Sequence, residues 1–121
     1  MSANTDRRSV CPVACTLDLI GDKWTLLVIR DLLSGKTKFK EFLQSPEHIA
    51  TNILAERLTR LHEHGLVERQ HSDVHSGRCD YVLTAKGLTL LPVLRAVAAW
   101  GLQHIEGTAA LIKPLPNHAT R

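Results

Sequence analysis

The sequence predicts a mainly helical α+β domain in which an amphipathic helix leads directly into a two-stranded hairpin. Leu54, Leu58 and Leu61 recur at spacings of four and three residues, so they share one face of a helix. That helix is expected to run from about Thr51 to His64. Gly65 follows it and suits the left-handed conformation that often ends a helix.

The hairpin is indicated by alternation along its second strand, where Cys79, Tyr81 and Leu83 fall on one side. The preceding segment 72–77, SDVHSG, is typical of a polar loop. A helix followed at once by a long basic hairpin is the order found in a winged helix-turn-helix. In such a domain the helix enters the major groove of DNA and the hairpin tip, or wing, reaches the flanking backbone. The order of elements therefore points to DNA binding.

The length of 121 residues allows one domain with short extensions. We expect a flexible N-terminal arm over residues 1–10, a winged helix-turn-helix domain with dimerisation helices over 11–106, and a loose tail over 107–121. A hydrophobic fraction of 44% is enough for a compact but small core.

The composition excludes several classes of protein. The apolar runs are far shorter than the roughly 18 residues of a membrane span, and the start lacks the apolar stretch of a secretory signal, so a cytoplasmic protein without a membrane partner is expected. Three cysteines do not suggest a disulfide scaffold. The net charge of +3 permits nucleic-acid binding without requiring it.

Three helices are expected before the amphipathic one. Pro12 can begin the first, which Gly21 would end. Asp22 is a candidate N-cap for the second, an apolar helix that should be the most buried and that Gly35 would end. A short helix over residues 38–43 should turn its apolar side chains inward.

A last long helix is expected after Thr84, a candidate N-cap, with a kink or break at Pro92. Its apolar residues exceed what so small a domain can cover, which favours a homodimer held by the first and last helices. The predicted dimer interface consists of Val13, Leu17, Leu91, Leu94, Val97, Ala98, Trp100 and Ile105.

Several separated segments together resemble one family, the HxlR-type winged helix-turn-helix regulators, which are related to the MarR-type regulators. The matching segments are CPV at 11–13, IGDKWTLLVIRDLLSG at 20–35, KFKEF at 38–42, LAERLTRLHEHGLVER at 54–69, YVLTAKG at 81–87 and LLPVLRAVAAWG at 90–101. Each segment alone is weakly specific, but the six in order are specific. The resemblance implies a homodimeric, DNA-binding transcriptional regulator that dimerises through its terminal helices.

The DNA-reading face is expected opposite the leucines of the amphipathic helix. Asn52 can pair with adenine, and Thr51 or Ala55 can contact a thymine methyl group. Thr51 is also expected to replace the hydroxyl N-cap that the family usually carries one position earlier. Glu56 can accept a hydrogen bond from a cytosine amino group, but it is rather expected to pair with Arg60 and orient that arginine. The predicted DNA contacts are Lys36, Lys38, Lys40, Thr51, Asn52, Ala55, Glu56, Arg57, Thr59, Arg60, His75 and Arg78.

Cys11 precedes Pro12 at the start of the first helix, where the helix dipole and free N–H groups favour a thiolate. Some HxlR-type regulators respond to oxidants or quinones through a cysteine at this position, so Cys11 is a candidate redox sensor and an oxidant or small molecule a candidate effector. The alternative is an inert packing thiol.

Other classes of function are less favoured. The spacing of His71, His75 and Cys79 loses its meaning on a hairpin, so neither a metal site nor a cofactor is predicted. The sequence shows no nucleophile elbow and no phosphate-binding loop, so an enzyme is not expected. The main alternative is a winged helix that binds another protein and whose basic face does not bind DNA specifically.

Overall fold

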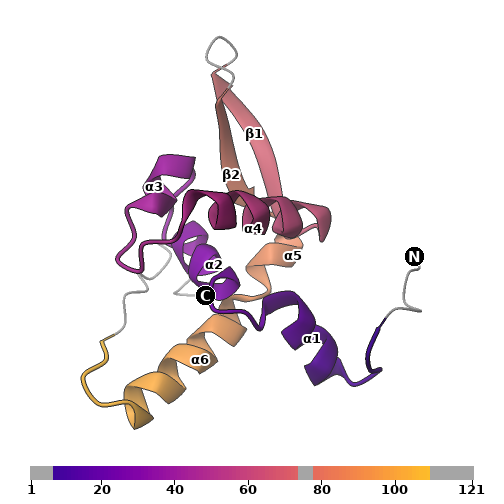
Figure 1. Cartoon of the computed structure of the whole chain (residues 1–121), viewed down its shortest axis with the longest axis vertical. Helices are drawn as coiled ribbons and strands as arrows, with labels where there is room; N and C mark the ends of the chain where they lie inside the picture. The colour runs from indigo at the N-terminus through magenta and orange to yellow at the C-terminus, as the bar shows by residue number, and fades with distance from the viewer. Residues whose placement is uncertain (1–6, 74–77, 110–121) are drawn as a thin grey trace.

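A computed structural model describes residues 7–73 and 78–109, and its elements follow the predicted order (Figure 1). Residues 1–6 and 110–121, most of the two predicted extensions, lie outside the described residues, as do 74–77 at the wing tip. The elements are α1 (Pro12–Ile20), α2 (Thr25–Leu33), α3 (Phe39–Leu43), α4 (Thr51–Glu63), β1 (Val67–Asp73), β2 (Arg78–Leu83), α5 (Ala85–Leu88) and α6 (Leu91–His104).

The core forms where α2 packs behind α4 and against the base of the hairpin (Figure 1). Leu54, Leu58 and Leu61 of α4 are all buried, which confirms the predicted inner face. Helix α2 is the most buried element, as its sequence predicts, with Ile29 and Leu33 almost without exposed surface. The arrangement buries one apolar face of α4 and leaves the opposite face to solvent.

The wing is an antiparallel pair in which Val67 lies opposite Leu83 and His71 opposite Cys79, with an irregularity in β1 after His71. The amide of Tyr81 donates a hydrogen bond of 2.8 Å to the carbonyl oxygen of Thr37, just before α3. The base of the wing is thereby joined to the helical body.

Two helix starts differ from the prediction. Helix α2 begins at Thr25 and not directly after Asp22, but the Asp22 carboxylate accepts hydrogen bonds from the amides of Trp24 (3.0 Å) and Thr25 (3.1 Å), so it still caps this end. The prediction that Thr51 caps α4 is wrong. Ala50 is the N-cap and makes no side-chain hydrogen bond, and Thr51 is the first helical residue, because the chain enters the helix one position earlier.

The predicted last helix is interrupted, as Pro92 suggested. Thr84 caps the short helix α5 by accepting a hydrogen bond from the Gly87 amide, and α6 begins after a turn at residues 89–90. Taken together, Ala85–His104 are long and apolar enough to cross a membrane by length and composition alone, which is weak evidence, and the stretch is broken at residues 89–90 and carries the charged Arg95.

Helices α1 and α6 extend from the body on the side opposite the wing (Figure 1). Val13, Leu17, Val97, Trp100 and Ile105 each expose more than half of their surface. Leu94 corrects the predicted interface, because it is 5% exposed and belongs to the core of the protomer. The apolar excess is therefore real, but it lies on the outer faces of the two helices.

Candidate nucleic-acid interface

The outward face of α4 is polar and accessible. Thr51, Asn52, Ala55, Glu56 and Thr59 are all exposed, while the leucines on the opposite face are buried. The structure thus brings the predicted base-reading residues together on one surface of a helix that is fixed from behind.

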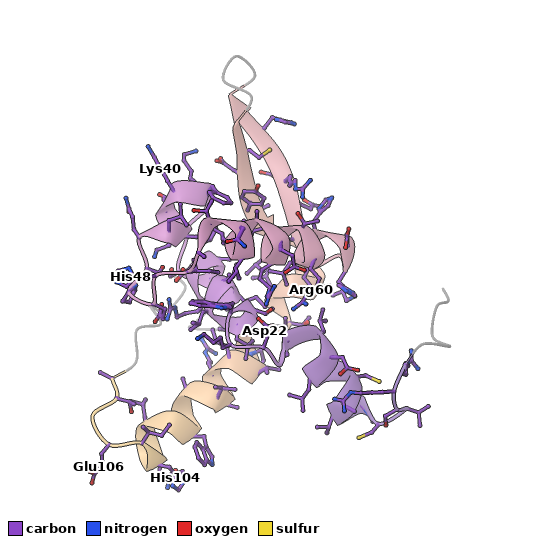
Figure 2. The ribbon with its side chains drawn as sticks, in the orientation of Figure 1. Asp22, Lys40, His48, Arg60, His104 and Glu106 are labelled. Carbon is purple, nitrogen blue, oxygen red and sulfur yellow. The ribbon has the colours of Figure 1, made fainter. Side chains whose placement is uncertain are left out.

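The three predicted lysines have different surroundings. The Lys36 ammonium donates a hydrogen bond of 2.6 Å to Ser45 Oγ and lies 3.7 Å from Asp31, whereas Lys38 donates one of 2.7 Å to Asp80 on the wing. Lys40 is exposed and projects from α3 on the side of the wing (Figure 2). Of the three, Lys40 is the side chain best placed to meet a phosphate.

The two predicted arginines of α4 turn toward the protein. Arg57 Nε donates to Asp22 at 2.8 Å, and Arg60 Nη2 donates to the same carboxylate at 3.1 Å. The expected pairing of Glu56 with Arg60 is wrong, since Glu56 pairs with Arg57 and Arg60 reaches back to Asp22. Asp22, which is 35 residues from Arg57 and 38 residues from Arg60 in sequence, thus takes the place of the expected partner one helical turn away.

A buried ionic cluster fixes the turn between α3 and α4, and the sequence analysis missed it. Arg30 donates two hydrogen bonds of 2.8 Å to the Glu47 carboxylate and two more, of 3.0 and 3.1 Å, to Asp31. Ser45 Oγ donates to Asp31. Hydrogen bonding from Arg30 lowers the pKa of Glu47, although partial burial opposes the shift. The cluster holds the turn that precedes α4 against α2.

Arg69 on β1 also lies at this surface, and the sequence did not predict it. Its guanidinium donates a hydrogen bond of 3.2 Å to Thr59 Oγ1, so an exposed arginine of the wing borders the outer face of α4. The only sequence signal that could have predicted this contact is the pairing register of the two strands of the hairpin. His75 lies outside the described residues, and of Arg78 only its backbone position in β2 is described.

Cys11 occupies the predicted position at the N-cap of α1, where it is exposed. Hydrogen bonds from the backbone amides of Ala14 and then Val13 lower the pKa of the Cys11 thiol. Its own amide donates to Ser9 Oγ at 3.0 Å. Cys15 and Cys79 are both half-buried. Among the described residues, the structure gathers no group of three or more His, Cys, Asp or Glu side chains suited to a metal ion.

An open apolar groove of about 500 Å³ lies between α1 and α6, and its lining begins at Pro12, the residue after Cys11. Its walls include Val13, Leu17, Leu26, Val93 and Val97. Of the residues expected at a dimer interface, Val13 and Leu17 of α1 and Val97 of α6 therefore line one shared groove.

Comparison with known proteins gives a consistent result. The model of the HxlR-like helix-turn-helix family matches residues 19–109. The HTH-type transcriptional regulator YodB of Bacillus subtilis is 34% identical over 99 residues, which are 81% of this chain and 88% of YodB.

Solved structures agree with that match. PA1607, described as a candidate transcription factor, superposes with a TM-score of 0.78 at 35% identity, over 94% of this chain and 80% of PA1607. The redox regulator HypR in its oxidised form superposes with a TM-score of 0.71 at 33% identity, over 77% of this chain and 96% of HypR. Quinone-bound YodB superposes with a TM-score of 0.65 at 35% identity, over 77% and 99%. The chain belongs to the HxlR-like helix-turn-helix family of transcriptional regulators.

Proposed function

We propose that this regulator binds an inverted-repeat operator as a homodimer and reads bases with the N-terminal half of α4. The observation that carries the proposal is the exposed row of Thr51, Asn52 and Ala55, which Thr59 continues one turn further on, on a helix whose other face is buried. The first turn of such a helix is the part that meets base edges in the major groove. An asparagine there can hydrogen-bond adenine bidentately.

The phosphate contacts are assigned to side chains that flank this row. Lys40 on α3 and Arg69 on β1 are both exposed. Their charges would position the protein on the backbone without reading the sequence. The wing tip with His75 and Arg78 stays a predicted contact to the flanking groove.

Dimerisation is supported by the outer faces of α1 and α6. The apolar side chains of Val97 and Trp100 expose 53% and 61% of their surface, and Val97 lines the groove between the two helices. A second copy would cover both. A two-fold dimer would place its α4 helices about 34–36 Å apart, one turn of DNA, which selects an inverted repeat.

Control by an electrophile or oxidant is proposed through Cys11. The thiol is exposed, its pKa is lowered, and it belongs to the residue directly before Pro12, which lines the α1–α6 groove. Among the similar solved structures, YodB is quinone-bound and the redox regulator HypR is in its oxidised form, which supports the same chemistry here. Modification would alter the start of α1, and with it the proposed dimer geometry.

The test is a gel shift with the DNA that flanks this protein's own gene, beside a random duplex of equal length. Asn52→Ala is expected to weaken binding to the preferred site by about 1–3 kcal/mol and to leave random DNA little changed. Glu63→Ala, at the far end of α4, serves as the matched control. Binding of wild type to both duplexes with equal affinity would favour the alternative, a winged helix that recognises another protein.

A further inference from the structure

A single carboxylate, that of Asp22, joins the start of α2 to α4 behind the DNA-reading face. Asp22 lies in the short link between α1 and α2, and Figure 2 shows it beside Arg60 of α4. One of its oxygens accepts hydrogen bonds from the amides of Trp24 and Thr25 and from Arg57 Nε. The other accepts from the Thr25 hydroxyl and from Arg60 Nη2.

Arg60 extends the connection to the first helix. The same Nη2 that reaches Asp22 also lies 3.3 Å from the carbonyl oxygen of Leu19, in α1, and 3.1 Å from Thr25 Oγ1. Thr25 is fully buried at the start of α2. The end of α1, the start of α2 and the middle of α4 therefore share one network of charged hydrogen bonds.

The surroundings of Asp22 favour its ionised carboxylate form. Partial burial acts to raise the pKa of Asp22, but hydrogen bonds from Thr25, Arg57 and the Trp24 amide together hold it well below its usual range. Hydrogen bonding to Asp22 raises the pKa of Arg57 in turn. Three-quarters of the Asp22 side chain is covered, and the Arg57 and Arg60 side chains are 19% and 29% exposed. Such partly desolvated charged hydrogen bonds are stronger than those of an exposed pair.

We propose that Asp22 is the positioning residue of the recognition helix, and that it sets specificity in two ways. It fixes the orientation of α4 relative to α1, the proposed dimer helix. It also holds Arg57 and Arg60 away from DNA, although both would otherwise be natural phosphate ligands on this helix. This inference rests on the proposed function, because it concerns how specific binding is separated from non-specific binding.

Both effects lower the same measurable quantity, which is the ratio of the affinity for the operator to the affinity for random DNA. A released α4 fits successive major grooves less well, which lowers affinity for the operator. Two released guanidinium groups strengthen binding to any DNA, because each phosphate contact adds to the counterion-driven affinity. Loss of the Asp22 charge should therefore lower the ratio of specific to random affinity from both sides.

The test uses the full chain with Asp22→Asn, which keeps the size of the side chain and one acceptor for the Trp24 and Thr25 amides. Dimer state, melting temperature and affinity for operator and random duplexes are measured over a range of salt concentrations. The ratio of specific to random affinity is expected to fall roughly tenfold or more. The log–log salt slope on random DNA should steepen by about one to two, one for each arginine that gains a phosphate.

Asp18→Asn is the matched control. Asp18 is an exposed aspartate on α1 that pairs with Arg8 at 2.7 Å, and its removal should change neither the ratio nor the slope. A triple variant, Asp22→Asn with Arg57→Gln and Arg60→Gln, should return random binding to the wild-type level while operator binding stays weak. That recovery would not follow from simple loss of stability.

Arg60→Gln covers the case in which Asp22→Asn does not fold, since it leaves the carboxylate and the cap of α2 in place. A folded Asp22→Asn or Arg60→Gln variant with the wild-type ratio would overturn the inference. Failure of the proposed function looks different, because the wild type itself would then bind operator and random duplexes equally.

Discussion

The Lys38 ammonium lies 2.7 Å from a carboxylate oxygen of Asp80 and so ties the start of α3 to the second strand of the wing. Beside this ion pair, the Glu41 carboxylate accepts hydrogen bonds of 2.9 Å from the amides of Thr37 and Lys38. Those two bonds lower the pKa of Glu41. The wing is thus held by the N-cap residue of the same short helix that carries Lys40, and Glu41 fixes the backbone at that N-cap.

Lys38 and Lys40 should consequently respond differently to removal of their charge. Lys40→Gln is expected to reduce the log–log salt slope of DNA binding by about one, as the loss of a single phosphate contact requires. Lys38→Gln should leave that slope nearly unchanged and cost about 0–1 kcal/mol of folding stability, because the pair is partly exposed. Binding isotherms at several salt concentrations decide between them. Equal slopes for both variants would contradict the assignment.

The proposed dimer interface can be tested by introducing a single charged side chain into it. Val97→Asp puts a carboxylate on an exposed apolar position that lines the groove between α1 and α6. We expect the variant to sediment as a monomer at micromolar concentration while its circular dichroism keeps the helical signal. Gln70→Glu, which adds the same charge on the exposed surface of β1, should remain a dimer. A dimeric Val97→Asp protein would place the interface elsewhere.

The helices and the hairpin followed from local pattern, because each buries a face that its own periodicity defines. The buried leucines of α4 and the exposed apolar face of α6 are examples. Leu94 shows the limit of that reasoning, since periodicity marks a residue as apolar but does not say whether its own protomer or a second copy covers it. The structure assigns Leu94 to the protomer.

The polar partners were much harder to predict. Local spacing offered Arg60 a partner at Glu56, one turn away, but Asp22 satisfies it together with Arg57 from 38 and 35 residues away. The buried cluster of Arg30, Asp31 and Glu47 likewise spans 17 residues. Such pairs depend on how helices pack in three dimensions, and a single sequence carries no periodic signal for them.

Gly87 should be intolerant of substitution for a reason unrelated to DNA. A Cβ atom at this position would lie 2.2 Å from the carbonyl oxygen of Leu66 and 2.8 Å from Leu83 Cδ2. Gly87→Ala is therefore expected to destabilise the fold by about 1–3 kcal/mol, since α5 must move away from the wing. Denaturant unfolding measures the loss. Gly101→Ala, where a Cβ atom meets nothing within 4 Å, is the matched control and should not destabilise.

Acid should weaken the fold through its paired carboxylates. The pKa values of Asp22, Glu41 and Glu47 are all lowered in the folded state, so the unfolded chain binds more protons as the pH falls. Their contribution to stability is complete above their unfolded values, about pH 4, and is lost progressively below it. Unfolding at a series of pH values should show this slope. Asp22→Asn should make the slope shallower below about pH 4, and an unchanged slope would contradict the contribution of Asp22.

The final prediction concerns the chemistry of Cys11. Its lowered pKa means that more of it is thiolate near neutral pH than for an ordinary cysteine, and its exposure leaves that thiolate accessible. Mass spectrometry after brief treatment with a quinone should find Cys11 modified before Cys15 and Cys79, which are half-buried. Treatment should also change affinity for the operator, because the adduct stands where α1 begins and α1 lines the groove that it shares with α6. Cys11→Ser should abolish the response and Cys79→Ser should retain it. If Cys11→Ser changes its affinity on treatment as much as the wild type does, Cys11 is a packing residue and the effector acts at another place.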